Sequence, residues 1–534
     1  MPQQQPYILH GRIVTMRSEN DIIADGYIGI KAGRIAAVAN KLTELPTEFT
    51  GKKIIHTEGT IYPGLIDLHN HFVYNVLPLW VVPKRYDNRS QWPAHAEYKS
   101  GVSKPIKQAL AKYSVSAKAL VRYVEAKALI SGTTTGQGMR TQVKGGSKIF
   151  EGAMRNVEEP GKNSGLPEAG SLVPDLVTTG ATAQERIDGF RNALNKPNRS
   201  AYFYHLSEGI DERSRKHFFN LRDNDLINNK LIGIHSLGLK KEDLLHLAGK
   251  GAKVVWSPFS NQLLYGRTVS LKDFKSSKIK FSLGCDWSPS GSKNMLQELK
   301  VAFHANKEQG DVFTTYELVR LATTAAAEVT GWQDHVGTLE KGKLADILVI
   351  GGKATDPYMH LVKALEKDVE LVVVDGIPRY GNISVMKDLH FDTSFPLEEI
   401  NISKKKKGIY LFCENSEIND VGFQSSMDTL EEIMKDLPGF VKKMEEEESI
   451  LMDMGQDPTQ EFTVVLDNEF EIEADVFQEY EIEDVAELLA DPLMADSVEF
   501  DTPLVEGKPY WDRIIAQKNI SNELKVWLKQ CYNQ

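Results

Sequence analysis

The sequence has few cysteines and no pair of them at metal-binding spacing. Of its 534 residues only three are cysteine, namely Cys285, Cys413 and Cys531, and no Cys-x-x-Cys pair occurs. This spacing excludes a zinc ribbon and argues against a disulfide framework. A metal ion bound by this protein would therefore be held by histidine and carboxylate side chains.

Segments that would carry the chain into or across a membrane are also missing. No apolar run approaches the ~18 residues that a membrane-spanning helix requires. The first residues, MPQQQPYILHGRIV, lack the basic stretch and apolar core of a secretion signal. We therefore expect a cytoplasmic protein with no membrane partner.

Basic residues are scarce in one part of the chain. Residues 414–499 contain 27 acidic residues against three lysines, a net charge of −24, whereas the whole chain carries −11. The rest of the chain is therefore mildly basic, at +13. We expect the acidic segment to dock on this remainder or on a neighbouring subunit, partly by long-range attraction.

The rhythm of the sequence changes three times, which predicts four segments. Residues 1–60 read as short strands with glycine-containing turns, and residues 336–385 have the same texture. Between them, residues 61–335 alternate strand-like and helix-like runs, which is typical of an α/β protein with a parallel (β/α)8 TIM barrel. Residues 386–534 are expected to form an acidic α+β appendage.

The barrel assignment depends on eight candidate strands, and the active site is expected at their C-terminal ends. The strands are predicted at residues 61–69, 132–138, 148–157, 170–178, 200–208, 230–236, 252–258 and 279–286.

The C-terminal segment contains several local patterns. The basic run SKKKKG at 403–408 predicts an exposed link, and MEEEES at 444–449 predicts a solvated helix face or loop. Acidic and apolar residues alternate at 469–473 and 479–483, which predicts two half-buried strands. One amphipathic helix face is expected near the C-terminus. Its apolar members are Ile514, Ile515, Leu524, Trp527 and Leu528.

Two histidines end the first predicted barrel strand. In GLIDLHNHFVYN, His69 and His71 are separated by one residue, so a strand would send both to the same side. A pair of surface or turn histidines is the alternative for an isolated His-x-His. His205, His235 and Asp286 end three further predicted strands, however. The five side chains together indicate a metal site on one face of the barrel.

The motifs PGLIDLHNH, SGTTTGQG, HLSEG, VVWSPFSNQLLYG, LGCDWSPSGS and VGTLEKGKLADILVI follow one another in the chain. Together they resemble the amidohydrolase superfamily, particularly its cytosine deaminase and chlorotriazine hydrolase branch. The resemblance covers about residues 5 to 385. It implies a (β/α)8 barrel flanked by a β-sandwich assembled from both N-terminal and C-terminal segments.

The resemblance also implies the site. One divalent metal ion would be bound by His69, His71, His205 and Asp286. Glu208 matches the proton-shuttling glutamate of the family, His235 would lie beside the polarised group of the substrate, and Asp286 would also orient the attacking water. Nitrogen and oxygen ligands suit zinc, with iron as the alternative.

Members of the family with two metal ions carry a carboxylated lysine at the end of the fourth strand. The run GSLVPDLVT at this place contains no lysine. The resemblance therefore favours a single metal ion.

The long insertion at residues 71–93 leaves two interpretations open. Its aromatic side chains could wall a pocket for a planar or apolar substrate, or simply pack the insertion onto the barrel. They are Phe72, Tyr74, Trp80, Tyr86 and Trp92. Trp256 and Asn261, near the seventh strand, are also expected to face the cavity.

The resemblance implies a hydrolase that attacks a non-peptide carbon–nitrogen bond of a small molecule through a metal-activated water. The bond could belong to an amide, a cyclic amide, or an amidine-type carbon that is deaminated. One alternative is another leaving group, such as halide or ester, and a second is a barrel that has lost catalysis. The presence of every site residue argues against the inactive scaffold. No nucleic-acid partner is expected, and a homo-oligomer remains open.

Overall fold

The computed structural model describes residues 5–143, 152–161, 164–414, 416–466 and 491–533. Eight short strands in its central region form two parallel sheets, with the orders β5-β6-β8 and β13-β12-β11-β10-β9. Each predicted barrel strand overlaps one of them, although residues 148–151 of the third lie outside the described residues. Their bounds are β5 (Leu65–Asp67), β6 (Thr133–Gly136), β8 (Arg155–Asn156), β9 (Glu168–Leu172), β10 (Arg199–Leu206), β11 (Leu231–His235), β12 (Lys253–Trp256) and β13 (Lys280–Leu283).

The two parallel sheets are hydrogen-bonded to each other at both of their edges. Ala169 N donates to Val157 O at 3.2 Å just beyond β8, and Leu68 N donates to Leu283 O at 3.3 Å between β5 and β13. A parallel bridge also joins Asn70 to Asp286. The first and last of the eight strands are therefore neighbours, although more than two hundred residues separate them in the chain.

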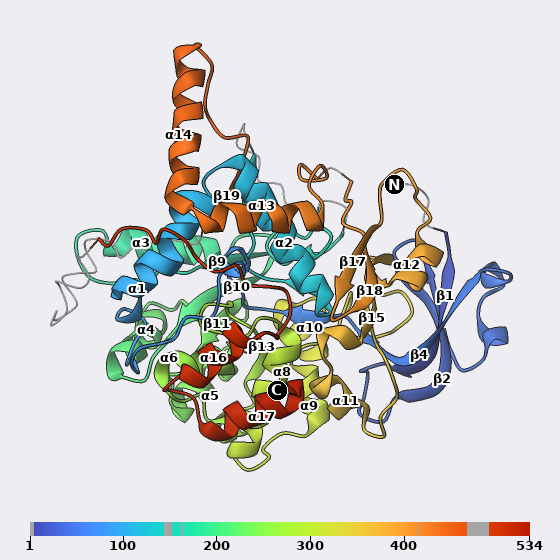
Figure 1. Ribbon diagram of the computed structural model, residues 1–534. Helices are drawn as coiled ribbons and strands as arrows, with labels where there is room; N and C mark the ends of the chain where they lie inside the picture. Colours follow the sequence, from blue (N-terminus) through green and yellow to red (C-terminus); the bar gives the residue numbers. More distant parts are fainter. Residues whose placement is uncertain (1–4, 144–151, 162–163, 415, 467–490, 534) are drawn as a thin grey trace.

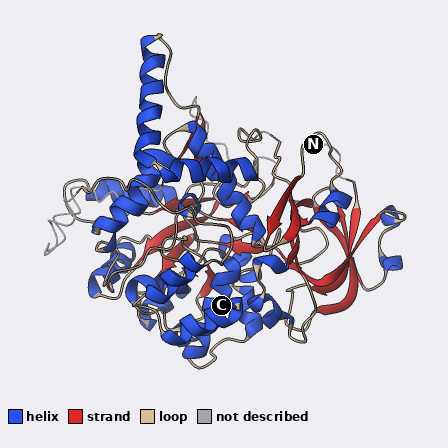
Figure 2. Cartoon of the chain, in the orientation of Figure 1, coloured by secondary structure: helices blue, strands red, loops and turns tan. Residues whose placement is uncertain are grey.

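Helices surround these strands, which lie inside this part of the molecule (Figure 2). Parallel strands covered on both faces need apolar side chains on both faces, and all five residues of β11, LIGIH, are buried. The helices that follow the strands are α2 (Ser114–Ile130), α3 (Ala183–Leu194), α4 (Glu212–Asp223), α5 (Lys241–Gly249), α6 (Pro258–Tyr265), α7 (Leu271–Ser277), α8 (Met295–Glu308), α9 (Thr315–Arg320) and α10 (Thr324–Thr330).

A separate nine-stranded sheet combines strands from residues 7–63 with strands from residues 347–409. Its strand order is β17-β18-β16-β15-β14-β4-β1-β2-β3. β14 pairs antiparallel with β4, so the N-terminal and C-terminal strands lie side by side (Figure 1). The sheet continues to residue 409, past the expected limit at residue 385. The bounds are β1 (Tyr7–Val14), β2 (Ile22–Lys31), β3 (Arg34–Ala39), β4 (Lys53–Pro63), β14 (Ile347–Ile350), β15 (Val369–Val374), β16 (Ile377–Asn382), β17 (Glu398–Ile402) and β18 (Lys405–Ile409).

The basic run at 403–408 differs from the sequence prediction. It is the turn and second strand of the β17–β18 hairpin rather than a link, and Lys404, Lys405 and Lys406 are exposed as predicted. The ammonium group of Lys407 is buried and donates to Val369 O at 2.5 Å and Asn382 Oδ1 at 2.7 Å. Charge alone predicted exposure, whereas a lysine buries its stem when main-chain and amide oxygens accept from its head.

Two helices follow the hairpin. α13 (Phe423–Lys435) packs on α2, whereas α14 (Leu437–Asp453) extends away from the rest of the molecule (Figure 1). MEEEES lies on α14, so the predicted solvated helix face is confirmed. The strands predicted at 469–473 and 479–483 lie outside the described residues.

The C-terminal amphipathic pattern belongs to two helices, α16 (Lys508–Ala516) and α17 (Asn522–Tyr532). Ser521 caps α17 by accepting from Leu524 N, which starts a new helix where the sequence indicated one continuous face. Ile514 and Leu528 are buried, whereas Ile515 is half exposed.

The C-terminal segment contacts the central region through buried and exposed groups. Arg122 of α2, fully buried, donates to the main-chain oxygens of Leu411, Ile418 and Val421. β19 (Phe462–Val464) pairs with β7 (Thr141–Val143). Three ion pairs with exposed carboxylates also join the segment to lysines of the central region. They are Lys104–Asp491, Lys112–Glu445 and Lys118–Asp420.

The remaining helices are short, and none of the described helices is long and apolar enough to cross a bilayer. They are α1 (Ala96–Tyr98), α11 (Pro357–Lys363) and α12 (Ile383–Leu389).

Candidate metal centre

Five predicted site residues lie where the parallel strands end. His69 and His71 follow β5, His205 is the penultimate residue of β10, His235 ends β11, and Asp286 follows β13. Because parallel strands end at the same edge of a sheet, these side chains converge although they come from distant parts of the sequence.

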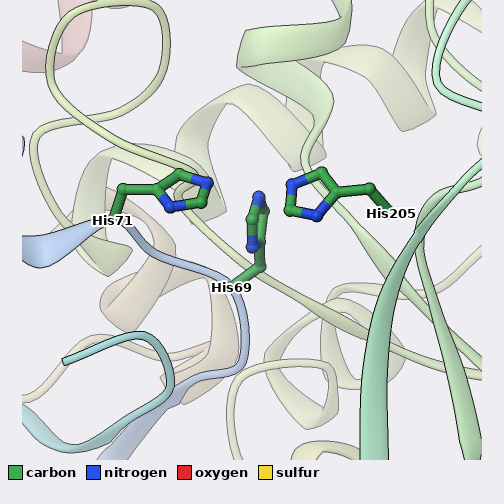
Figure 3. Close-up of side chains that lie close together, drawn as sticks. All are labelled: His69, His71 and His205. Carbon is green, nitrogen blue, oxygen red and sulfur yellow. The ribbon is translucent and has the colours of Figure 1, made fainter. Parts of the chain in front are cut away.

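Ring nitrogens of His69, His71 and His205 lie within 4.8 Å of one another. Figure 3 shows the three rings facing one another, with His69 between the other two. Oδ1 of Asp286 is 3.1 Å from Nε2 of His69 and 3.6 Å from Nε2 of His71. A second group within 4.8 Å combines His69, His235 and Asp286. The side chains are buried, the most exposed residue at 4%.

This donor set fits a divalent transition metal. Three imidazoles and one carboxylate are the ligand types that zinc and iron accept, and they leave room for water in the coordination sphere. Cys285, the nearest cysteine in the sequence, has its thiol against Met295 Sδ instead. The centre is therefore composed of histidine and carboxylate, as the scarcity of cysteine predicted.

The electrostatics of the cluster favour the protonation states that bind metal. Burial alone would raise the pKa of Asp286, but His69, His235 and His71 hold it well below its usual range. Burial, followed by the neighbouring imidazoles and Arg89, holds the pKa of His205 well below its usual value. An ionised carboxylate and a neutral imidazole are the forms that donate lone pairs to a metal ion.

Two of these residues have strained backbones. The φ angle is +62° at His235 and +67° at Asp286, in the left-handed region that side chains other than glycine rarely adopt. Strain of this kind persists only where the surrounding structure enforces it, and it concentrates at functional sites.

Glu208 lies beside the cluster and has its own set of partners. Its Oε2 is 3.7 Å from Nε2 of His235 and 3.9 Å from Nε of Arg89. Its Oε1 accepts a 2.7 Å hydrogen bond from the phenol of Tyr265, at the end of α6. Burial and the charge of Glu208 hold the pKa of Tyr265 well above its usual value, so this phenol remains a donor.

His235 is oriented from its other side by Asn261. Nδ1 of His235 lies 3.1 Å from Oδ1 of Asn261, on α6. Thr268 Oγ1 accepts from Asn261 Nδ2 at 3.4 Å and from the buried indole of Trp256 at 2.7 Å. Asn261 therefore directs Nε2 of His235 toward Glu208. Trp256 contributes indirectly, because it donates to the same Thr268 hydroxyl as Asn261.

A model of the Amidohydrolase family matches residues 198–378. A 5-methylthioadenosine/S-adenosylhomocysteine deaminase of Bacillus cereus is 25% identical over 410 residues, covering 69% of this chain and 92% of that protein. Over residues 198–378 the chain is therefore similar to the amidohydrolase superfamily. The predicted resemblance is confirmed, and so is the prediction of a metal-dependent enzyme of the amidohydrolase or deaminase type.

Solved structures of lower identity share the fold of this chain. The guanine deaminase of E. coli has a TM-score of 0.54 at 18% identity, over 70% of this chain and 99% of that one. A triazine hydrolase from Arthrobacter aurescens has a TM-score of 0.52 at 16% identity, over 70% and 94%.

Asp67 was not among the residues that the sequence patterns indicated. It precedes His69 in the run LIDLH, where a carboxylate among apolar residues was the available signal. Its Oδ1 accepts from Cys285 N at 3.0 Å, and its Oδ2 accepts from Asn70 Nδ2 at 2.8 Å. Burial raises its pKa to about 6, although these hydrogen bonds lower it. Asp67 therefore fixes the main chain beside both His69 and Asp286.

The aromatic side chains of the insertion at 71–93 are all buried, so packing explains part of their presence. Two of them reach the candidate site through Trp287, next to Asp286. The Trp287 ring lies 5.5 Å from the ring of His71, 4.9 Å from Tyr74 and 5.9 Å from Trp92. The prediction that the insertion walls a substrate pocket stays a prediction.

Proposed function

We propose that this enzyme holds one divalent metal ion, zinc in preference to iron, in the cluster described above. The ligands are His69, His71, His205 and Asp286. The observation that carries the proposal is the convergence of three imidazoles within 4.8 Å of one another, with Asp286 Oδ1 3.1 Å from His69 Nε2 and 3.6 Å from His71 Nε2. The fourth strand, β9, has the sequence EAGSL and offers no lysine, which supports a single ion.

The proposal includes a (β/α)8 barrel and a split β-sandwich. The hydrogen bonds at both edges of the two parallel sheets support the barrel. The mixed origin of the nine-stranded sheet supports a module shared by the two ends of the sequence. The domain limits at residues 60, 335 and 385, the cytoplasmic location and a homo-oligomer stay predictions.

Each remaining polar group has a distinct role in this proposal. A bound divalent ion supplies Lewis acidity that makes water a nucleophile near neutral pH. Asp286 orients that water, and Glu208 takes its proton and returns it to the leaving nitrogen. His235 donates toward the atom of the substrate that becomes negatively charged. The phenol of Tyr265 donates to Glu208 and so fixes the orientation of its carboxylate.

The substrate we propose is a small ring compound with an exocyclic amino group on an amidine-type carbon, which the enzyme deaminates. The deaminase relative supports this choice, because its name states deamination of purine nucleoside derivatives. The rings of Tyr74, Trp92 and Trp287 near the cluster support a planar substrate, since aromatic faces stack on flat rings.

A hydrolysis screen tests the proposal. Purified protein is analysed for metal and assayed with aminopurines, aminopyrimidines, aminotriazines, cyclic amides and the matched chlorotriazines, with ammonia, amine and chloride measured separately. We expect near-stoichiometric transition metal and ammonia release from an amino-substituted ring. Chloride release alone would replace deamination by dehalogenation. Absence of metal with no turnover on any substrate would favour the inactive scaffold.

A further inference from the structure

Two lysines of the central region share one carboxylate from the C-terminal segment. Nζ of Lys127, on α2, is 2.6 Å from Oδ2 of Asp501, and Nζ of Lys293, just before α8, is 2.7 Å from Oδ1. None of the three residues is more than 5% exposed. Asp501 is fixed at its main chain, because its N donates to Val76 O at 2.9 Å and its O accepts from the phenol of Tyr123.

Lys127 also reaches the two loops that carry the metal centre. Its ammonium donates to Asn75 O at 2.7 Å and to Ser288 Oγ at 2.9 Å, in addition to Asp501. An ammonium has three hydrogens, and these three acceptors use all of them. Asn75 lies four residues after His71, and Ser288 lies two residues after Asp286.

Hydrogen bonds continue from these acceptors to the main chain of the centre. Asn75 Oδ1 accepts from Ser288 N at 2.7 Å, and Asn75 Nδ2 donates to Asn70 Oδ1 at 2.9 Å. Asn70 Nδ2 donates to Asp67 Oδ2, and Asp67 Oδ1 accepts from Cys285 N. Consecutive hydrogen bonds therefore link Asp501 to Cys285, the residue that precedes Asp286.

We propose that Asp501 is a positioning residue for the metal centre, acting through Lys127 on the loops that follow His71 and Asp286. This inference rests on the proposed function only in assuming that the cluster binds metal. Without the Asp501 carboxylate, the two buried ammonium groups face each other and lose the ion-pair partner that they share, which is strongly unfavourable. Lys127 then moves away from Lys293 and releases Asn75 and Ser288.

The first test is Asp501→Asn in the full-length chain, with Zn²⁺ affinity measured by competition with a chelator. Changes in groups that orient metal ligands typically weaken metal binding by 10- to 100-fold. We expect at least about a 10-fold weaker Zn²⁺ affinity and an altered absorption spectrum of bound Co²⁺. The control is Lys300→Met, because this buried ammonium bonds Leu296 O and Ala364 O, outside the network, and should leave affinity unchanged.

A second change separates positioning from simple anchoring of the C-terminal segment. Combining Asp501→Asn with Lys293→Met removes the excess cation, and the amide oxygen can still accept from Lys127. We expect Zn²⁺ affinity to recover most of the loss. Lys293 also donates to Thr502 O and Leu504 O, so loss of its ammonium weakens the anchoring further. If Asp501 only anchored the C-terminal segment, the double variant would therefore bind Zn²⁺ more weakly than the single variant.

Ser288→Ala tests the other end of the network and covers the case in which Asp501→Asn does not fold. It removes one acceptor of Lys127, and we expect a several-fold weaker Zn²⁺ affinity. Wild-type protein that binds no metal would overturn the proposed function and this inference with it. Wild-type protein that binds Zn²⁺, with unchanged affinity and Co²⁺ spectrum in Asp501→Asn and Ser288→Ala, would overturn the positioning role alone.

Discussion

The phenol of Tyr265 donates a 2.7 Å hydrogen bond to Oε1 of Glu208, while Oε2 of the same carboxylate faces His235 at 3.7 Å. Tyr265 in turn accepts from the indole of Trp92 at 3.1 Å. One oxygen of Glu208 is thus occupied by a fixed donor and the other is directed toward the cluster. In the proposed function, this arrangement leaves Glu208 to transfer protons while other residues hold the metal ion.

Glu208→Gln should separate these two functions in an experiment. The amide keeps the size and polarity of the side chain but cannot accept and return a proton. We expect the variant to fold, to retain its metal and to lose on the order of 10²-fold or more in turnover. Metal analysis beside turnover on a substrate from the screen checks this.

His71→Ala and Asp286→Ala are the matched comparisons, because both change expected ligands. Each should lose metal as well as activity. A Glu208→Gln enzyme with near-normal turnover, or one without metal, would show that Glu208 has been given the wrong role.

Tyr265→Phe tests how far turnover depends on the orientation of Glu208. The change removes the hydrogen-bond donor to Glu208 Oε1, and loss of one buried partner typically costs about 1–3 kcal/mol. We expect turnover to fall by about 10-fold or more while metal content stays unchanged. Tyr7→Phe is the control, since it removes a buried phenol that bonds Gly376 O in the nine-stranded sheet. Equal effects of both variants on turnover would exclude a specific role for Tyr265.

The sequence predicted the centre because its signals were local. His-x-His after an apolar run, and single polar residues at the ends of other runs, place side chains at strand ends whatever the details of packing. His69, His205 and Asp286 meet in the structure for this reason. Their roles as ligands came from the family resemblance and stay proposals.

Partners distant in sequence could not be predicted in this way. Asp501 looks like any acidic residue of a charged segment until Lys127 and Lys293 are found on either side of it. Lys407 was expected at the surface because charge patterns carry no information about which oxygens lie nearby. The loops that orient metal ligands are built from such long-range contacts.

We expect Lys300 to make the free energy of unfolding depend on pH. Its Nζ is fully buried, and burial lowers its pKa from 10.5 to about 8. Between these pH values the unfolded chain binds more protons at this lysine than the folded chain, so its contribution to stability rises with pH. Relative to Lys300→Met, the free energy of unfolding of the wild type should increase by up to about 3 kcal/mol between pH 8 and pH 10.5.

Urea unfolding at several pH values measures this difference. Lys518→Met, at an exposed position after α16, controls for the loss of one lysine. If the free energy of unfolding of the wild type and that of Lys300→Met changed in parallel with pH, Lys300 would not titrate in the way that its burial indicates.

A chain truncated after residue 390 tests how the C-terminal segment is attached. The truncation removes the β17–β18 hairpin and leaves Arg122 without its three main-chain acceptors. It also removes the carboxylate between Lys127 and Lys293. Breaking one buried charge pair typically costs about 3–5 kcal/mol. We expect the truncated chain to aggregate, which solubility and size-exclusion chromatography would reveal.

The exposed ion pairs should contribute far less to this attachment. Lys112→Ala combined with Lys118→Ala removes two of them, and exposed pairs are typically worth at most about 1 kcal/mol each. The full-length chain should therefore keep its size and melting temperature both in this double variant and at high salt. A truncated chain that stays soluble would show that the rest of the protein does not depend on docking of the segment. A full-length chain whose melting temperature falls steeply with salt would show that charge attraction contributes more to the attachment than the buried contacts do.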